Sequence, residues 1–581
     1  MEEITLKIGG IAGAGIKSTG EIFAKICLRS GWHVFDYTEY PSLIRGGHNT
    51  YHVRAATEPI WSTVQYIHIL IALNEEAVRL HLEHVIEGGV VVYDPSVVDA
   101  EKLGRGRSDV RFCAVPFAEL AISSGGIEKM GNMVSIGAVV GLLHGSLKIT
   151  KSVIADIFAT KGEQIVSQNE VAAEAGYEYV QEHFSEPFAW TLHELDAPEQ
   201  MLVAGNEALG FGALAGGVQF YAGYPMTPSS SILHFMAKYG PKQGVVVKHA
   251  SDEIGAVNMC IGAGFAGARA MTASSGGGFS LMVESLGLAG ITETPIVITE
   301  VQRGGPATGL PTWTEQADLR FVAHASQGEF PRVLLAPASV EECFTHAALA
   351  LNLAEIAQTP VLILSDKLLA ESQKSTEPFT SKHVAIDRGK LMTTREANRQ
   401  KDYHRYEITE DGISPRAVPG LPNTLFLANS DEHDTYGYSE ENAENRTAMV
   451  DKRARKLEQI KDLLPKPIII GPKQADYTFI TWGSTMGPVL DAMRILEAEG
   501  HSVQMYRLPV ILPFPSEEVT QFLETTTQTI LVENNSEGQL GGLIREKTGY
   551  ELDVHMLKYD GRPFFPEEIV QNFLAMIEEA H

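Results

Sequence analysis

The chain has few cysteines and no close pair of them. Only four occur in 581 residues, and they lie far apart: Cys27, Cys113, Cys260 and Cys343. A disulfide framework needs many cysteines in a short chain, and an iron–sulfur cluster needs closely spaced thiolates such as Cys-x-x-Cys. Neither can be built from this chain alone, so we expect buried free thiols.

Basic charge and long apolar runs are also scarce. The formal net charge is −27 at pH 7, with 46 Lys and Arg against 73 Asp and Glu. Nucleic-acid binding normally requires a basic face, so neither nucleic acid nor an anionic membrane is an expected partner. The chain begins Met1-Glu2-Glu3-Ile4, acidic where a signal peptide is basic, and no apolar run is long enough to cross a bilayer. We therefore expect a cytoplasmic protein with no membrane partner.

A complete dinucleotide-binding fingerprint is missing as well. The strand-like stretch 4–8 leads into a glycine-rich segment with Gly13 and Gly15, but Lys17 and Ser18 stand where the third glycine is required. A nicotinamide or flavin site is therefore weakly supported. A phosphate-bearing ligand at the start of the following helix stays open, because exposed backbone amides attract anions whatever the glycine count.

The chain does contain a multi-domain α/β pattern. Its length suits three or four domains, and 44% hydrophobic residues with 54 glycines are typical of a globular protein. Short apolar strand-like runs alternate with helical patterns, and we expect a parallel sheet in the first part. The predicted domains cover residues 1–185, 201–373 and 468–581, with a linker at 186–200 and a connecting region at 374–467 that holds one charged helix near 442–463.

Three short motifs in the second domain form the most informative pattern. They are Tyr224-Pro225-Met226-Thr227-Pro228, Asp252-Glu253-Ile254-Gly255 and Ser274-Ser275-Gly276-Gly277-Gly278. A carboxylate such as Glu253 suits the N1′ nitrogen of thiamine diphosphate, since protonation there lets the exocyclic amine act as a base. Thr227 offers a hydroxyl near the reacting carbon, and glycines and serines let backbone approach a flat ring. We interpret the set as half of a thiamine diphosphate site, with Tyr224, Pro225, Glu253, Ser275 and Gly276 as cofactor-binding residues.

Each of these motifs has a structural alternative. Glu253 precedes an apolar helix-like run, where an acid also serves as a first-turn partner for the helix dipole. A turn threonine such as Thr227 commonly bonds only its own backbone. The functional interpretation is favoured because the three motifs occur together.

A fourth motif follows the predicted strand at 295–299. The segment Gln302-Arg303-Gly304-Gly305-Pro306-Ala307-Thr308-Gly309 is too rich in glycine and proline to continue the strand, so we expect a loop at the carboxyl edge of the sheet. The guanidinium of Arg303 can bind a carboxylate through two hydrogen bonds, and a 2-oxoacid always presents one. The alternative for Arg303 is a surface salt bridge.

Taken in order, these motifs resemble the alpha subunit of the 2-oxoacid:ferredoxin oxidoreductase family. The segments Tyr40-Pro41-Ser42-Leu43-Ile44-Arg45-Gly46-Gly47-His48 and Gly131-Asn132-Met133-Val134 are similar to the gamma subunit of that family. Gamma and alpha would then be fused, with a gamma-like α/β domain at 1–185, a pyrimidine-binding domain at 201–373 and a transketolase C-terminal-like domain at 468–581.

The resemblance implies oxidative decarboxylation of a 2-oxoacid with coenzyme A, giving an acyl-CoA, carbon dioxide and electrons for ferredoxin; some family members run it in reverse. Glu253 would activate the cofactor, and Thr227 and Arg303 would hold the substrate. Arg45, His48 and Thr308 are our candidates for contacts with the substrate or coenzyme A.

Two features that this chemistry needs are absent from the chain. Thiamine diphosphate is held through a divalent metal, which requires a Gly-Asp-Gly segment, and no Gly-Asp-Gly occurs here. The cysteine spacing of an electron relay is also missing. We therefore expect no metal site in this chain, and a beta subunit that supplies the diphosphate grip, Mg²⁺ and an iron–sulfur cluster. The resemblance implies a dimer of such heterodimers.

The identity of the substrate is predicted less directly, because a single arginine can bind the carboxylate of any 2-oxoacid. A fused gamma–alpha chain with Tyr-Pro-Met-Thr-Pro-Ser-Ser most resembles the 2-oxoglutarate subgroup, whose product is succinyl-CoA. Pyruvate and branched-chain 2-oxoacids stay open. So do two other classes, a non-oxidative thiamine enzyme component and a non-catalytic scaffold subunit.

Overall fold

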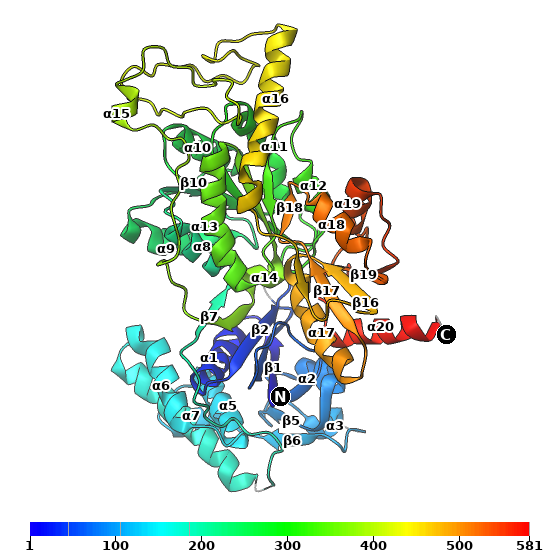
Figure 1. The fold of residues 1–581 in the computed structure, drawn as a ribbon. Helices are drawn as coiled ribbons and strands as arrows, with labels where there is room; N and C mark the ends of the chain where they lie inside the picture. The colour runs from blue at the N-terminus through cyan, green and yellow to red at the C-terminus, as the bar shows by residue number, and fades with distance from the viewer. Residues whose placement is uncertain (44–45, 105, 185, 580–581) are drawn as a thin grey trace. The chain divides into compact units, whose positions relative to one another are not determined.

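The computed structural model describes residues 1–43, 46–104, 106–184 and 186–579, without the side chains of residues 100 and 101, as an α/β protein with several sheets (Figure 1). The chain divides into two compact units. Unit 1 comprises Met1–Val203, Ser372–Pro378 and Phe565–His581, and unit 2 comprises Ala204–Glu371 and Phe379–Phe564. The units group segments that are distant in sequence, and the domain boundaries expected from the sequence stay predictions.

Unit 1 is built on a mixed sheet whose described strands follow the order β6-β5-β4-β1-β3-β2-β14-β7. Strands β1, β4, β5 and β6 run parallel, whereas β3 is antiparallel to both β1 and β2. The strands are β1 (Glu3–Ile11), β2 (His33–Glu39), β3 (His48–Ala56), β4 (Ile67–Ala72), β5 (Val85–Tyr93), β6 (Arg111–Ala114), β7 (Met201–Ala204) and β14 (Gln373–Thr376).

The prediction of a parallel sheet was wrong for the β1–β3–β2 part of unit 1. Only residues 40–47 separate β2 from β3, which is too few for the crossover that a parallel pair needs. Strand β3 was missed because His48, Asn49 and His52 interrupt the apolar pattern that signals a strand.

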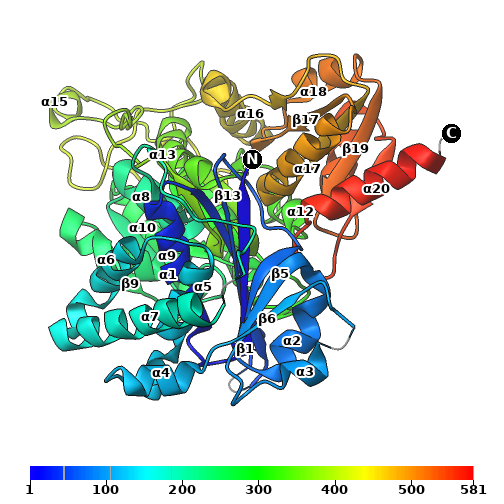
Figure 2. The same cartoon turned by 90° about the horizontal axis from the view of Figure 1, so that it is seen from below.

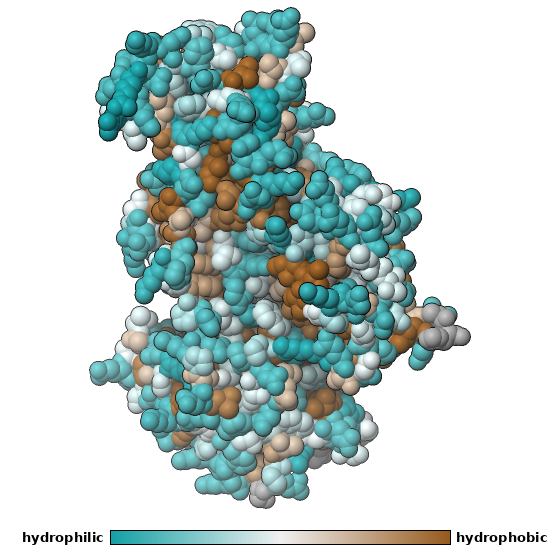
Figure 3. Space-filling model, in the orientation of Figure 1, coloured by the Kyte–Doolittle hydropathy of each residue, from teal (hydrophilic) through white to brown (hydrophobic). Residues whose placement is uncertain are grey.

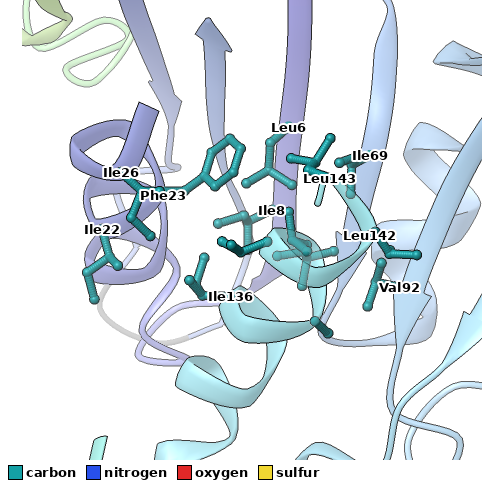
Figure 4. Close-up of a cluster of buried hydrophobic side chains, with 14 of the residues drawn as sticks. Leu6, Ile8, Ile22, Phe23, Ile26, Ile69, Val92, Ile136, Leu142 and Leu143 are labelled. Atoms are coloured by element: carbon teal, nitrogen blue, oxygen red, sulfur yellow. The ribbon is translucent and has the colours of Figure 1, made fainter. Parts of the chain in front are cut away.

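Helices cover both faces of this sheet. Alternation along the strands decides which face a side chain joins: Ile69 and Val92 pack in the core with α1 and α5, whereas Leu70 and Val91 pack with α2. Figure 4 shows the first of these cores, and Figure 2 shows α2 and α3 beside β5 and β6, away from α5 and α7. The helices of unit 1 are α1 (Ile16–Arg29), α2 (Glu75–His81), η1 (Leu82–His84), α3 (Ala100–Leu103), α4 (Phe117–Ser123), η2 (Glu128–Met130), α5 (Gly131–Leu142), α6 (Leu147–Phe158), η3 (Ala159–Lys161), α7 (Glu163–His183) and α20 (Pro566–Glu579).

Unit 2 contains two further sheets. The larger has the order β18-β12-β13-β11-β10-β8-β9 and is parallel except for β18, and the smaller has the order β15-β17-β16-β19-β20 and is parallel except for β15. Their strands are β8 (Phe220–Gly223), β9 (Val246–His249), β10 (Ala270–Ser274), β11 (Ile296–Gln302), β12 (Val333–Leu335), β13 (Pro360–Asp366), β15 (Ile468–Ile470), β16 (Tyr477–Thr481), β17 (Val503–Arg507), β18 (Val510–Leu512), β19 (Gln528–Glu533) and β20 (Val554–Leu557).

The C-terminal part of unit 2 joins the larger sheet through β18, which pairs with β12. One apolar core also runs through both parts, with Ile298 and Leu364 from the larger sheet and Ile480 and Leu531 from the smaller. The helices of unit 2 are α8 (Gly205–Ala215), α9 (Ser230–Tyr239), η4 (Gly240–Gln243), α10 (Glu253–Phe265), α11 (Gly276–Ile291), α12 (Leu319–Ala323), α13 (Val340–Ala357), α14 (Lys367–Glu371), α15 (Thr394–Ala397), α16 (Ala443–Ile460), η5 (Lys461–Leu463), η6 (Gly483–Thr485), α17 (Met486–Ala498), α18 (Ser516–Leu523) and α19 (Gln539–Thr548).

The polar region after β14 is attached to unit 2 by buried ion pairs rather than by a large apolar core. The predicted charged helix is confirmed as α16, and its Lys452 and Lys456 both pair with Glu293, all three side chains being at most 1% exposed. A second buried carboxylate, Glu355 of α13, pairs with Arg388 and Arg416. These pairs compensate buried charges that would otherwise be costly.

The surface is largely hydrophilic, with separate hydrophobic patches on the face that Figure 3 shows. Within the described residues, no helix combines the length and the apolar character that crossing a membrane requires.

Candidate functional site

The motifs singled out in unit 2 lie at the carboxyl ends of its parallel strands. The Tyr224–Pro228 turn follows β8, Glu253 begins α10 shortly after β9, Ser274 ends β10, and Arg303 follows β11. Open α/β sheets bind their ligands at this edge. The topology therefore collects four sequence-distant segments at one edge of one sheet.

Glu253 is the first residue of α10 and is only 3% exposed. Its neighbour Asp252 caps the helix, with Oδ1 accepting a hydrogen bond from the Gly255 amide at 2.7 Å. Because Asp252 takes the capping role, Glu253 is not needed for it, and its Oε1 is buried without a hydrogen-bond partner among the described residues. A buried acceptor left unpaired is costly unless a ligand supplies the donor.

The Ser274–Gly278 segment forms the wall beside this carboxylate. A Cβ on Gly278 would lie 2.1 Å from Ser274 Oγ and 2.6 Å from Glu253 Oε1, so only glycine fits. Ser275, at the N-cap of α11, is fully buried and its Oγ also lacks a partner in the described part of the chain. Gly276 is equally confined, because its Cβ would lie 2.4 Å from Asp318 Oδ2.

Arg303 reaches the Tyr224–Pro228 turn. Its Nη1 donates a hydrogen bond to the Thr227 carbonyl oxygen at 2.6 Å, and the side chain is half-buried rather than on the open surface. Met226, in the same turn, has its Sδ 3.8 Å from Ser274 Oγ. Thr227 and Arg303 are thus brought together, and Met226 links their turn to the wall beside Glu253.

The remaining predicted residues of this region are more exposed. Tyr224 is 37% exposed, with its ring centroid 6.2 Å from that of His249, and Pro225 is exposed beside it. Thr308 is exposed on the loop closed by the Gly304–Leu310 bridge. Exposed side chains of this kind are available to a ligand, but their positions do not indicate which ligand binds.

The two candidates of the N-terminal segment belong to unit 1. His48 opens β3, and its Nε2 lies 2.8 Å from Nε2 of His81, so the two imidazoles share a hydrogen bond. Burial lowers the pKa of His48 below its usual value, which favours the neutral ring. Arg45 lies outside the described residues.

Sequence reasoning missed a group of carboxyls near Arg303. Burial raises the pKa of Asp318 to about 6, and burial with the neighbouring Asp318 raises that of Glu315 to about 7. Glu300 and Asp366, which lie near the ends of β11 and β13, also have raised pKa values, chiefly because of burial. Both lie within their strands, so a charged residue near the end of an otherwise apolar strand was the available signal for Glu300 and Asp366.

The arrangement is suited to holding a flat, partly basic ring and an anion. Glu253 offers a carboxylate oxygen that has no partner among the described residues, and Arg303 offers a cationic fork with one N–H already used. At the start of α11, Gly277 leaves room for close backbone approach, because a Cβ there would meet nothing nearer than the Ala307 carbonyl oxygen at 4.0 Å. These are the features expected at a cofactor site next to an anionic substrate.

Comparisons with known proteins agree with this chemistry. A family model described as "Pyruvate flavodoxin/ferredoxin oxidoreductase, thiamine diP-bdg" matches residues 211–452. One described as "Pyruvate ferredoxin/flavodoxin oxidoreductase" matches residues 5–179, and one described as "Pyruvate:ferredoxin oxidoreductase core domain II" matches residues 475–569.

Relatives are similar over the whole length of the chain. The alpha subunit of 2-oxoacid:ferredoxin oxidoreductase 2 from Aeropyrum pernix is 34% identical over 637 residues, covering 100% of this chain and 98% of that protein. The 2-oxoglutarate oxidoreductase subunit KorA of Mycobacterium tuberculosis is 30% identical, covering 98% and 91%. A solved 2-oxoglutarate:ferredoxin oxidoreductase from Magnetococcus marinus, with 2-oxoglutarate, coenzyme A and succinyl-CoA bound, superposes with a TM-score of 0.93 at 33% identity over 99% of both chains.

The fold and these full-length similarities define a thiamine-diphosphate-type subunit of an oxidoreductase that acts on 2-oxoacids. The chain belongs to the 2-oxoacid:ferredoxin oxidoreductase alpha subunit family, in the form with a fused gamma-like N-terminal domain.

Proposed function

We propose that this chain, together with a beta subunit, converts 2-oxoglutarate and coenzyme A into succinyl-CoA and carbon dioxide, with two electrons passed to ferredoxin. The single observation that carries the site assignment is the buried, unpaired Oε1 of Glu253 beside the glycine wall at Gly278. The proposed location is the cytoplasm, and the same chemistry can run in reverse when reduced ferredoxin is abundant.

The residues at this edge fit thiamine diphosphate. When bound, the cofactor supplies a carbanion that attacks the 2-oxo carbonyl. Glu253 would accept a hydrogen bond from the N1′ position of its aminopyrimidine and hold the proton there. Tyr224, Pro225, Ser275 and Gly276 would line the ring, and the absence of a Cβ at Gly278 avoids a collision with Glu253 Oε1, which would lie 2.6 Å from it.

Arg303 and Thr227 would orient the substrate. A guanidinium has five N–H donors, and Arg303 uses one of them to bond the Thr227 carbonyl oxygen. The other donors can still bind a carboxylate bidentately. The Thr227 hydroxyl would lie toward the reacting carbonyl, and Thr308 would contact the substrate from the same loop as Arg303. His48 and Arg45 would serve coenzyme A from the gamma-like part of the chain.

A beta subunit is required by what the chain lacks. No Gly-Asp-Gly segment and no Cys-x-x-Cys pair occur, so the diphosphate, Mg²⁺ and the iron–sulfur cluster are assigned to the partner. Helices α10 and α11 also expose apolar side chains that a partner would cover: Ile254 is 49%, Met259 43% and Leu281 49% exposed. The expected assembly is a dimer of heterodimers.

The choice of 2-oxoglutarate is supported by the names of relatives, and the structure narrows the candidates for binding its second carboxylate. Arg269 is buried in an ion pair with Glu355 and is not available for a second substrate carboxylate. Lys248 and His249, at the end of β9 near Tyr224, are the accessible alternatives in unit 2. Pyruvate and branched-chain 2-oxoacids would not need either of them.

The test is dye reduction by the native complex, purified anaerobically. Viologen reduction should depend on coenzyme A and be fastest with 2-oxoglutarate among 2-oxoglutarate, pyruvate and branched-chain 2-oxoacids. Faster reduction with another acid would keep the reaction and change the substrate. No reduction by a complex that retains thiamine diphosphate and its iron–sulfur partner would favour a non-oxidative thiamine enzyme.

A further inference from the structure

A buried glutamate without a hydrogen-bond partner lies near the end of β11. Glu300 is 0% exposed, and neither of its carboxyl oxygens has a hydrogen-bond partner among the described residues. It is in register with Ser274 of β10 and Leu364 of β13, and it shares a strand face with Ile298, which is in the core with α10 and α11. A carboxylate is strongly disfavoured where no donor reaches it, so the geometry favours the neutral acid.

The other acids around Glu300 differ from it in their contacts. Asp366 of β13 accepts hydrogen bonds from Gln316 at 3.3 Å and from the Leu369 amide at 3.1 Å. Asp318 lies against the N-terminus of α11, since a Cβ on Gly276 would be 2.4 Å from its Oδ2. Among the described residues, only one oxygen of Glu253, Oε1, is buried without a partner, whereas both oxygens of Glu300 are. Glu300 is therefore the carboxyl of this group whose two oxygens are both buried without a partner in the described part of the chain.

The protonation state of Glu300 bears on Arg303. The charged groups that act on Glu300 are Asp318, Asp366 and Arg303, and those that act on Arg303 are Asp318 and Glu300. If Glu300 and Asp318 were both ionised, two negative charges would act on one half-buried guanidinium. An approaching substrate carboxylate would then meet a net negative environment.

We infer that Glu300 is a positioning residue, a neutral carboxylic acid that leaves Arg303 with a single carboxylate neighbour and so keeps it able to bind the carboxylate of a 2-oxoacid. This inference rests on the proposed function, because it uses Arg303 as the substrate-binding cation. It assigns to Glu300 no contact with the substrate itself.

The electrostatics of the site agree with this assignment. Burial raises the pKa of Glu300 well above its usual range, and Asp318 and Asp366 add to the shift while Arg303 opposes it. Raising the pH should eventually ionise Glu300, compensate the charge on Arg303 and weaken substrate binding. The KM for the 2-oxoacid should therefore rise at high pH, by up to about tenfold per pH unit once Glu300 titrates.

The first test compares pH profiles of KM and kcat in the native complex. The Glu300→Gln variant cannot ionise, so its KM should not show the rise that the wild type shows at high pH. Its kcat should stay within about twofold of the wild type, as expected where binding of the ground state and of the transition state changes equally. Glu458→Gln, which removes an exposed carboxylate from α16, should keep the wild-type profile. An unchanged pH profile of KM in Glu300→Gln would overturn the inference. Glu300→Met serves the same purpose if Glu300→Gln does not fold.

The second test does not depend on turnover. Infrared difference spectra of the complex with ¹³C-labelled glutamate, wild type minus Glu300→Gln at neutral pH, should show a protonated carboxyl C=O band that the variant lacks. If the difference spectrum shows only carboxylate bands, Glu300 is ionised at neutral pH and the inference is overturned, whatever the activity of the complex. If the band is present but none of the 2-oxoacids supports dye reduction by the wild-type complex, the proposed function fails, and with it the role of Glu300 at Arg303.

Discussion

Single residues at the start of α10 and α11 carry most of the chemistry that we assign to this chain. Glu253 is buried, its Oε1 has no hydrogen-bond partner in the described part of the chain, and Asp252 takes the capping role. A Cβ at Gly278 would lie only 2.6 Å from that oxygen. A structural helix-start acid would be expected to bond the backbone of its own first turn, as Asp252 does. The division of roles between these adjacent acids favours a ligand-facing role for Glu253.

Replacing Glu253 by Gln should abolish most of the turnover. The amide cannot hold the proton in the same way, and general acid–base groups of this kind contribute on the order of 10² to 10⁴ in rate. We expect CoA-dependent dye reduction to fall by that factor, while assembly and melting temperature stay near the wild type. Asp252→Asn is the matched control, since asparagine caps a helix as well as aspartate does. Near-wild-type activity in Glu253→Gln would contradict the assignment and favour a scaffold role.

Gly278→Ala should damage the same site by shape alone. The added methyl group would collide with Ser274 Oγ and Glu253 Oε1, so either the carboxylate or α11 has to move. We expect a loss of kcat and weaker retention of thiamine diphosphate on gel filtration of the complex. Gly262→Ala on α10 is the control: nothing lies within 4 Å of its Cβ, and alanine should stabilise the helix by about 1 kcal/mol. Equal behaviour of the two variants would argue against a confined site at Gly278.

At the scale of elements, α16 depends on the buried carboxylate of Glu293. Lys452 Nζ lies 2.6 Å and Lys456 Nζ 2.5 Å from its oxygens, and Arg405 donates a hydrogen bond to its backbone carbonyl at 2.8 Å. Burial acts to raise the pKa of Glu293, but the adjacent cations prevail and hold it below its usual range. The helix is therefore attached through charge pairing, in agreement with the polar composition of the region.

Glu293→Gln should release α16 from the rest of unit 2. Breaking a buried pair leaves cations uncompensated, at a cost of roughly 3–5 kcal/mol. Denaturant unfolding or proteolysis of the α16 region would measure it. Glu551→Gln, which removes an exposed partner of Arg545, should change stability by less than about 1 kcal/mol. A cost for Glu293→Gln no larger than that of Glu551→Gln would contradict the anchoring role.

The same pair predicts the pH dependence of unfolding for this element. The pKa of Glu293 is lower in the folded than in the unfolded chain, so its stabilising contribution is present above the unfolded value of about 4.5 and is lost as the pH falls below it. Wild-type protein should therefore lose stability on acidification more steeply than Glu293→Gln does. Parallel acid-unfolding curves for the two proteins would contradict this.

At the scale of the whole molecule, our proposal divides the site between this chain and a beta subunit. In that proposal this chain provides the pyrimidine-side carboxylate and the substrate-side arginine, and its sequence has no Gly-Asp-Gly segment for the diphosphate. We expect thiamine diphosphate with Mg²⁺ to bind the isolated chain weakly, and to bind the complex with the beta subunit tightly. Calorimetric titration of both samples would show it. Equally tight binding to the isolated chain would place the diphosphate grip within this chain.

How far the sequence predicted the structure differs between parts of the chain. The strands β11, β13 and β16 were predictable because they are short apolar runs between turn residues, and α16 because a charged helical pattern stands out in a polar region. Strand β3 was not, because its polar side chains hide the pattern. The attachment of α20 to unit 1 was not predictable either, since packing across more than three hundred residues leaves no local signal.

For the candidate site, the sequence by itself determined the reaction family, through motifs whose residue types match thiamine and carboxylate chemistry, and the full-length similarities confirm that family. The roles of Glu253, Thr227 and Arg303 stay predictions. Only the tertiary structure decided which groups surround them, because burial and the absence of donors depend on neighbours from other strands and helices. Glu300 is the clearest case: its sequence shows only a charged residue near the end of an apolar strand, and its chemistry comes from the charges that folding places around it.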